Sequence, residues 1–158
     1  MEKKYRLLEN DTIMVNGTTL HRIEALKDFA DVKKGDKGGY VESEENLSHE
    51  GACWFFDDAW VSGNARVFDN ACVSDNACVF GDAWVSGNAL VSGNARVFDN
   101  AWVSDNACVF GYACVSGNTL VYGDALVSGN ARVHGDAKVC GDARIYEGEI
   151  ESGVITKK

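Results

Sequence analysis

Three histidines, His21, His49 and His134, are the side chains best suited to acid–base chemistry near neutral pH. His134 lies in a regular repeat, two residues after Arg132, at a position that points outward from a strand. We retain it as the one candidate general base, although its position favours an ordinary solvated surface histidine. Because the other two histidines lie far away in the sequence, we expect no three-histidine metal site, no other metal and no cofactor.

Six cysteines could support redox or metal chemistry: Cys53, Cys72, Cys78, Cys108, Cys114 and Cys140. They form no Cys-x-x-Cys pair, and none has a histidine at the spacing of a zinc site. Most of them recur at outward positions of the repeat, where cysteine serves as a small apolar filler. We therefore assign the cysteines to packing rather than to chemistry.

The charge balance is acidic, with 24 acidic and 15 basic residues and a formal net charge of −9. Direct nucleic-acid binding requires a basic stripe and is disfavoured, whereas a basic protein surface remains a possible partner. Aspartates recur at predicted corners, among them Asp69, Asp75, Asp99 and Asp105. Their carboxylates could form hydrogen bonds with backbone groups at these corners. Alternatively, stacked carboxylates could imitate a phosphate backbone and inhibit a nucleic-acid-binding protein.

A six-residue repeat from Trp54 to Tyr146 positions most of these side chains. Its unit reads Val-x-Gly-Asn-Ala-x, with about sixteen copies of the valine-type position. The valine and its two neighbours predict a short strand, and the Gly, Asn and Asp positions predict a tight corner. A period of six matches no helix. Because one unit buries little by itself, the repeat predicts an all-β solenoid stacked from coils.

Two other regions flank the repeats, so we divide the chain into residues 1–53, 54–146 and 147–158. The first region predicts short strands at 5–8, 12–15 and 19–23, with a hairpin turn at Asn16-Gly17. We expect it to cap the first coil, because an exposed terminal coil is an open sheet edge. The tail should close the other end or fray. No apolar run is long enough to span a membrane and the N-terminus does not read as a signal peptide, so we expect a cytoplasmic protein.

The hexads resemble the hexapeptide-repeat superfamily, whose members have an aliphatic residue followed four positions later by a small one. The resemblance implies a left-handed parallel β-helix with triangular coils of three hexads, usually trimeric and often an acyltransferase. Such enzymes use a histidine near a subunit interface, often beside a loop that interrupts the coils, and here no loop interrupts the hexads. Residues 19–47 are also similar to the head of small phage and prophage proteins of this superfamily, which are often labelled transferases.

If each coil holds three hexads, the predicted solenoid has three outer faces. The first carries Trp84, Trp102 and Leu120, and the second carries Phe80, Phe98 and Arg96. Such apolar outer surface favours an interface, so we expect a homotrimer and designate these six residues as its contacts. A groove for a separate partner is the alternative interpretation of the same surface.

A duplication bears on the function. Residues 63–92 and 93–122 agree at 25 of 30 positions, and five copied hexads place the copy on a different face. A row of ligand-binding residues along one face would not be preserved by such a copy, because the copied residues lie on another face. We therefore predict a non-enzymatic scaffold or binding protein that docks to or sequesters a host or phage component, and the resemblance of residues 19–47 implies that it is phage-associated. The alternatives are an acyltransferase that uses His134 and the acidic inhibitor.

Overall fold

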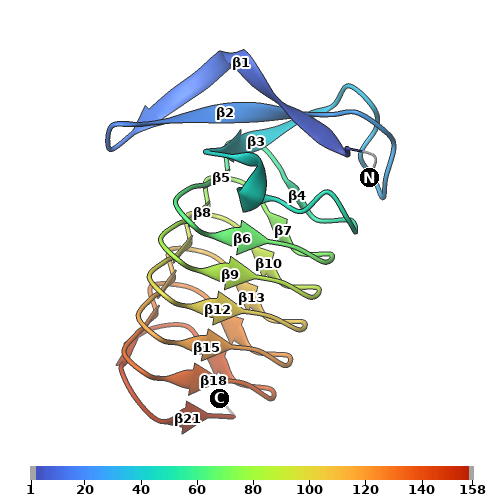
Figure 1. Cartoon of the computed structure of the whole chain (residues 1–158). Coiled ribbons are helices and arrows are strands. Elements are labelled where there is room, and N and C mark those ends of the chain that lie inside the picture. The colour runs from blue at the N-terminus through green and yellow to red at the C-terminus, as the bar shows by residue number, and fades with distance from the viewer. Residues whose placement is uncertain (1–2, 157–158) are drawn as a thin grey trace.

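The computed structural model describes residues 3–156, and it forms a parallel β-solenoid beneath an antiparallel hairpin (Figure 1). Each hexad contributes one two-residue strand, and each strand pairs in parallel with the strand three hexads further on, as Val67 does with Val85. In Figure 1 the front strands run to the right and the chain then turns behind them while descending from the cap, so the coil is left-handed. The predicted left-handed parallel β-helix is confirmed.

Three faces make up the solenoid, and each is a stack of strands from successive coils. The first face consists of β6 (Arg66–Val67), β9 (Trp84–Val85), β12 (Trp102–Val103), β15 (Leu120–Val121), β18 (Lys138–Val139) and β21 (Val154–Ile155). The second face consists of β5 (Trp60–Val61), β8 (Cys78–Val79), β11 (Arg96–Val97), β14 (Cys114–Val115), β17 (Arg132–Val133) and β20 (Glu149–Ile150). The third face consists of β4 (Trp54–Phe55), β7 (Cys72–Val73), β10 (Leu90–Val91), β13 (Cys108–Val109), β16 (Leu126–Val127) and β19 (Arg144–Ile145).

The core is a column of valines and alanines along the axis of the solenoid. The valine-type residues from Phe55 to Val139 and the small residues from Ala59 to Ala143, including Thr119, are at most 1% exposed. Valine fills the flat faces and alanine fits inside the corners, because only a small side chain has room where the chain turns. Successive coils share this dry interior, so the strands stabilise one another by stacking.

The corners require a left-handed backbone, which explains their restricted composition. The first corner residue has a positive φ in every hexad from Asp57 to Gly141 and is always glycine or aspartate. Glycine adopts this conformation without strain, and aspartate tolerates it better than most residues. The sequence pattern therefore encodes the corner geometry directly.

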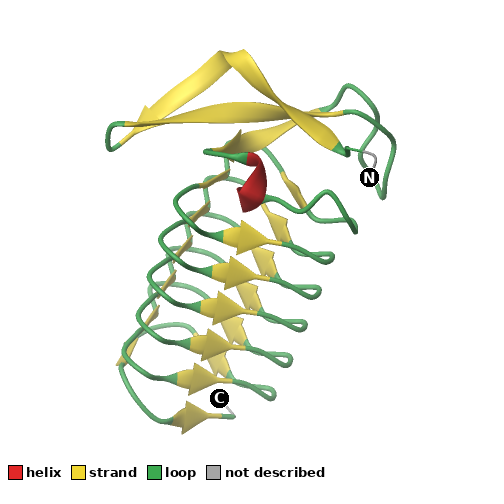
Figure 2. Cartoon of the chain, viewed as in Figure 1, coloured by secondary structure: helices red, strands yellow, loops and turns green. Residues whose placement is uncertain are grey.

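The cap is built from β1 (Tyr5–Val15), β2 (Thr18–Ala25) and β3 (Lys37–Val41) (Figure 2). The strands β1 and β2 form the predicted hairpin around Asn16-Gly17, where both residues have positive φ. The strand β3 pairs antiparallel with β2 on one side and parallel with β5 on the other. The hairpin thereby joins the sheet of the second face and covers its upper edge.

A short 3₁₀ turn, η1 (Glu44–Asn46), leads from the cap into the first coil. Leu47 then lies beside Val67, twenty positions on, whereas Phe55 lies beside Val73, eighteen positions on. The register of the coils therefore breaks by two residues between Leu47 and Phe55. The two extra residues let the segment after η1 bulge outward above the first face.

The tail continues the solenoid as a shortened sixth rung on two faces. Ile150 lies beside Val133 and Ile155 beside Val139, so the tail keeps pairing in parallel after the hexads end. Both isoleucines are partly buried against the core. The shorter spacing of seventeen and sixteen positions makes this last coil narrower than the others.

Candidate functional site

An aromatic column lies on the first face. The rings of Trp84 and Trp102 meet edge to face with centroids 5.2 Å apart, and Leu120 continues the column one rung below. The indole Nε1 of Trp102 donates a hydrogen bond to Ser86 Oγ at 3.1 Å, which fixes the tilt of this ring. Trp84 is 38% exposed and Trp102 is 39% exposed, so both present apolar surface to the outside.

A second aromatic column lies on the second face. Phe80 and Phe98 stack in parallel with centroids 4.9 Å apart, and Trp60 stacks on Phe80 at 5.6 Å. Arg96 lies between Cys78 and Cys114 in the neighbouring column of the same face. The structure thus places the six predicted contact residues in two groups, on faces that meet at the corners around residues 81–82 and 99–100.

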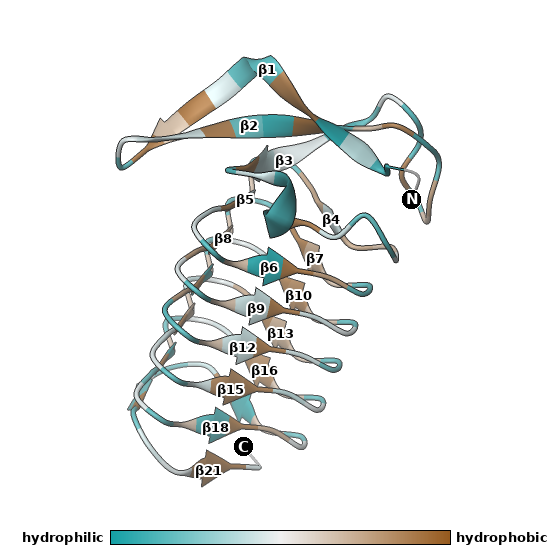
Figure 3. Ribbon diagram, in the orientation of Figure 1, coloured by the Kyte–Doolittle hydropathy of each residue, from teal (hydrophilic) through white to brown (hydrophobic). Residues whose placement is uncertain are grey.

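A groove opens at the cap end of the first face, beneath η1. Its volume is about 470 Å³, and it is lined by Glu44, Glu45, Leu47, Ser48, His49, Glu50, Arg66, Val67, Phe68 and Trp84. Phe68 and Trp84 form the floor, with an edge-to-face contact at 5.7 Å. Figure 3 shows the hydrophilic η1 turn overhanging the strands of the first face. The groove was not predicted, because it depends on how the bulging segment lies over β6.

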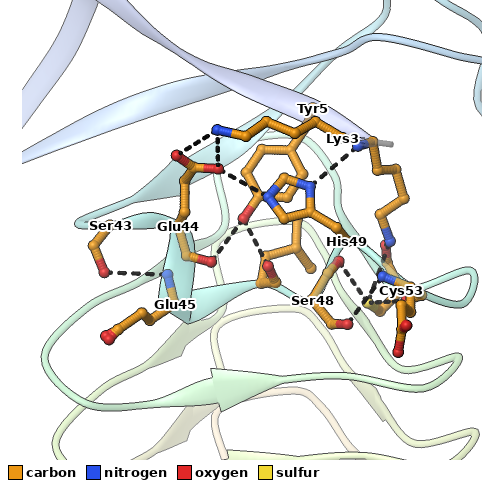
Figure 4. A network of polar contacts seen from close by, with 11 residues as sticks. Lys3, Tyr5, Ser43, Glu44, Glu45, Ser48, His49 and Cys53 are labelled. Carbon is orange, nitrogen blue, oxygen red and sulfur yellow. Dashed lines mark hydrogen bonds and ion pairs between the residues drawn. The ribbon is translucent and has the colours of Figure 1, made fainter. Parts of the chain in front are cut away.

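A polar network holds the roof of this groove to strand β1 (Figure 4). Tyr5 donates its hydroxyl to the carbonyl oxygens of Glu44 at 2.9 Å and Leu47 at 2.6 Å, and its ring stacks on His49. Burial raises the pKa of Tyr5, so its hydroxyl remains a donor. Hydrogen bonds from His49 and then from Lys3 lower the pKa of Glu44, which favours the ionised carboxylate at the rim.

His49 is committed to structure on both ring nitrogens. The backbone N–H of Lys4 donates to Nδ1 at 3.1 Å, so Nδ1 is an acceptor and the proton lies on Nε2. Nε2 in turn lies 2.9 Å from a carboxylate oxygen of Glu44. A ring with both nitrogens occupied by protein groups has no free position for a substrate proton, so His49 is poorly placed as a general base.

Lys4 is a buried lysine that the sequence analysis missed. Its Nζ donates to the carbonyl oxygens of Cys53 at 2.7 Å and Gly51 at 3.3 Å, contacts Cys53 Sγ at 3.4 Å and lies 4.8 Å from the centroid of Phe29. Burial lowers the pKa of Lys4 and raises that of Cys53. No periodic signal marks this residue, because the hydrogen-bond partners of its side chain lie more than forty positions away.

All six cysteines are free. Cys53, which precedes the repeat, lies inside, one coil above Ala71 in the alanine column. Cys78 and Cys140 are also buried by their outward neighbours, and burial raises the pKa of Cys78 to about 11. A thiol with a raised pKa is a poor nucleophile at neutral pH, which accords with a packing role.

His134, the candidate general base, lies on the second face near the lower end of the solenoid. Its Nε2 is 3.1 Å from a carboxylate oxygen of Glu149, although the pair lacks the angle of a good hydrogen bond. A shallow pocket beside it is lined by Phe98, Cys114, Ser116, Arg132, Val133, His134 and Glu149. The structure therefore brings His134 together with one carboxylate, but it does not bring the other two histidines near it.

The corner aspartates are engaged with the backbone of the next coil. One carboxylate oxygen of each of Asp69, Asp75, Asp99 and Asp105 accepts a hydrogen bond of 3.1 or 3.2 Å from the N–H of the glycine one coil on. In the next corner position, asparagines form ladders such as Asn70–Asn88–Asn106, with contacts of 3.3 Å. These bonds favour the interpretation that the corners use aspartate to satisfy backbone groups.

Two features are absent from residues 3–156. These residues contain no group of three or more His, Cys, Asp or Glu side chains placed to hold a metal ion. Within the same range, no helix has the length and apolar character needed to cross a bilayer.

Comparisons with known proteins agree with the repeat. The family described as YdcK Beta solenoid repeat matches residues 83–97, 89–105 and 121–135. An Escherichia coli (strain K12) protein named Uncharacterized acetyltransferase YdcK is 37% identical over 78 residues, covering 40% of this chain. The match covers 24% of that protein, so this chain spans only about a quarter of its relative. Together with the fold, these matches support the resemblance to the hexapeptide-repeat superfamily.

Proposed function

We propose that this β-solenoid is a non-enzymatic scaffold that assembles with copies of itself and docks a host or phage component through its outer faces. The observation that carries the proposal is the pair of aromatic columns on two neighbouring faces. Apolar surface of this kind is costly to leave in water and is typical of interfaces. The phage setting rests on the resemblance of residues 19–47.

The arrangement of the two columns suits a cyclic trimer. In a ring of identical copies, two different surfaces of each copy meet head to tail. The corner that separates the first and second faces would point to the threefold axis. Phe98 of one copy would then pack on Trp102 of the next, and Phe80 would lie against the lower edge of Trp84, so that the side of Trp84 toward Phe68 and η1 stays open.

A direct test is the mass of the native assembly. We expect the unmodified chain to be trimeric and the Trp84→Asp, Trp102→Asp double variant to be monomeric, because each change places a carboxylate in the apolar contact. The matched control is Leu90→Asp with Phe110→Asp on the third face, where the exposed fractions are 37% and 38%. A monomeric unmodified chain, or equal dissociation of the two variants, would contradict the proposed assembly.

The partner is tested by capture on the assembled protein. The two double variants serve as bait beside the unmodified chain, and captured proteins are identified by mass spectrometry. We expect a partner that binds the unmodified chain and the Leu90→Asp, Phe110→Asp control, but not the variant of the first face.

The second candidate function is an acyltransferase, favoured by the acetyltransferase name of the similar Escherichia coli protein. His134 would then act as the general base, because it lies on the second face that we place in the assembly contact. Release of free coenzyme A from acetyl-coenzyme A, measured with amine and hydroxyl acceptors, tests this function. Turnover that is lost in His134→Ala but kept in His21→Ala would support the enzyme over the scaffold.

A further inference from the structure

We propose that the groove beneath η1 binds the cationic side chain of an arginine or lysine in a basic protein segment. This inference rests on the proposed docking function and names the chemistry of the docked partner. It is carried by the composition of the groove, in which an aromatic floor faces a carboxylate rim.

The floor offers an aromatic face to a cation. The indole of Trp84 is 38% exposed, and Phe68 holds it from the side in an edge-to-face contact. A guanidinium or ammonium group over an indole face is attracted by the ring quadrupole, and the attraction grows as water is excluded. The roof above this floor excludes water from one side.

The rim supplies the opposite charge. The lining includes the carboxylates of Glu44, Glu45 and Glu50 against the single guanidinium of Arg66, so the groove has a net negative charge. Glu44 is engaged by Lys3 and His49, which leaves Glu45 and Glu50 as the exposed carboxylates that would meet a ligand. Arg66 also lines a second pocket with Glu42 and Glu45.

The roof is held in place before any ligand arrives. The side-chain oxygen of Asn46 accepts hydrogen bonds from the backbone N–H groups of Glu42 at 2.9 Å and Ser43 at 3.0 Å. The side-chain nitrogen of Asn46 donates to the carbonyl oxygen of Ala65 at 2.8 Å, which ties the turn to the first coil. A turn whose backbone is already fixed loses less conformational entropy on binding than a mobile one.

Other occupants fit this groove less well. An anionic ligand would meet the rim carboxylates and the net charge of −9 of the whole chain. A purely apolar ligand would desolvate the carboxylates without compensating for their charge. A second copy of this acidic chain could bring a single arginine, and the test below treats that occupant as a separate outcome.

The probe is a capped peptide of alternating arginine and alanine, and the matched ligand control replaces every arginine with citrulline, which has a similar shape and no charge. We expect the arginine peptide to bind and the citrulline peptide not to bind. Affinity should fall as salt is raised, because the rim carboxylates are exposed. Equal binding of the two peptides would overturn the proposal.

Protein variants locate the site. We expect Glu45→Gln with Glu50→Gln to weaken binding of the arginine peptide about tenfold, the scale of two exposed charge contacts. The matched control, Glu147→Gln with Glu151→Gln, makes the same change in net charge at the opposite end and should not alter binding. Trp84→Leu should weaken binding, whereas Phe110→Leu on the third face, which changes an equally exposed aromatic residue outside the groove, should not.

The mass of the assembly is measured in the same samples, so that a failure of the trimer proposal can be told apart from a failure of the groove proposal. A chain that does not assemble but binds the arginine peptide at the groove would refute the trimer and leave the groove proposal standing. Binding that is weakened equally by both glutamine pairs would show general attraction to an acidic surface and overturn the groove proposal. Binding that appears only when the assembly is dissociated would show that a second copy fills the groove, which also overturns it.

Discussion

At the scale of single residues, polar groups in this chain serve the backbone wherever the coils turn or end. Lys4 closes the top of the apolar core by donating to carbonyl oxygens of the first coil. The corner aspartates accept hydrogen bonds from backbone N–H groups of the next coil, as Asp105 does from Gly123. Both are charged residues in a fold that has little room for unsatisfied polar groups.

Lys4 should stabilise the cap. We expect Lys4→Met to lower the free energy of unfolding by about 1–3 kcal/mol, because the buried carbonyl oxygen of Cys53 would lose its donor and the partly buried carbonyl oxygen of Gly51 would lose this hydrogen bond. The matched control is Lys3→Met, which removes only a surface ion pair with Glu44 and should change stability by less than about 1 kcal/mol. Denaturant unfolding measures both. Equal effects would show that the buried ammonium has no special role.

Substitutions of Asp105 distinguish the effect of its negative charge from the effect of the corner geometry. Asp105→Ala removes the acceptor for the N–H of Gly123 and puts alanine at a φ of 58°, so we expect a loss of about 1–3 kcal/mol. Asp105→Asn keeps an acceptor and tolerates the left-handed backbone, so its stability should stay close to that of the unmodified chain. If asparagine is as damaging as alanine, the negative charge itself matters and the proposed corner role is wrong.

At the scale of elements, the periodic part of the structure was predictable and the cap contacts were not. The hexads fix which side chains point inward, because each repeat alternates a strand with a corner that admits few residue types. The groove depends instead on η1 and on contacts such as that of Lys4 with His49, which are 45 positions apart. The register break after Leu47 signals an extra bulge, but it does not say over which face the bulge lies.

Equivalence of the hexads predicts how the solenoid responds to deletions. Removal of residues 85–90, one hexad, should leave a folded solenoid with all six predicted contact residues, but it would move Trp102 from the first face to the second. Removal of residues 121–138, one full coil, should leave the aromatic columns where they are. We therefore expect both variants to unfold cooperatively and only the hexad deletion to lose the assembly. Native mass and circular dichroism measure the two properties.

The two deletions distinguish the presence of the aromatic side chains from their position on the faces of the solenoid. Loss of assembly in both deletions would contradict a contact confined to the upper rungs. Loss of folding after the hexad deletion alone would contradict the equivalence of the three faces.

At the scale of the whole molecule, the two ends of the solenoid are closed to different degrees. At the upper end, β3 and the hairpin continue the second face, and a Cβ on Gly39 would collide with the carbonyl oxygen of Ala59, so the cap lies close on the first coil. At the lower end, β20 and β21 form a narrowed rung with Ile150 and Ile155 only partly buried. Stability in a stack depends on neighbours, so a terminal rung with one neighbour is the weaker one.

Amide hydrogen exchange should reveal this asymmetry. We expect the backbone N–H groups of β11 and β12 to exchange most slowly, because both have paired rungs above and below. Exchange should quicken toward β20 and β21, but the first coil beneath the cap should stay nearly as protected as the centre. Lys4→Met, the cap variant, should speed exchange at the upper end and leave the lower end unchanged. Symmetric fraying of the unmodified chain would contradict a cap that seals the core, and uniform exchange along the column would show that the solenoid opens only as one cooperative unit.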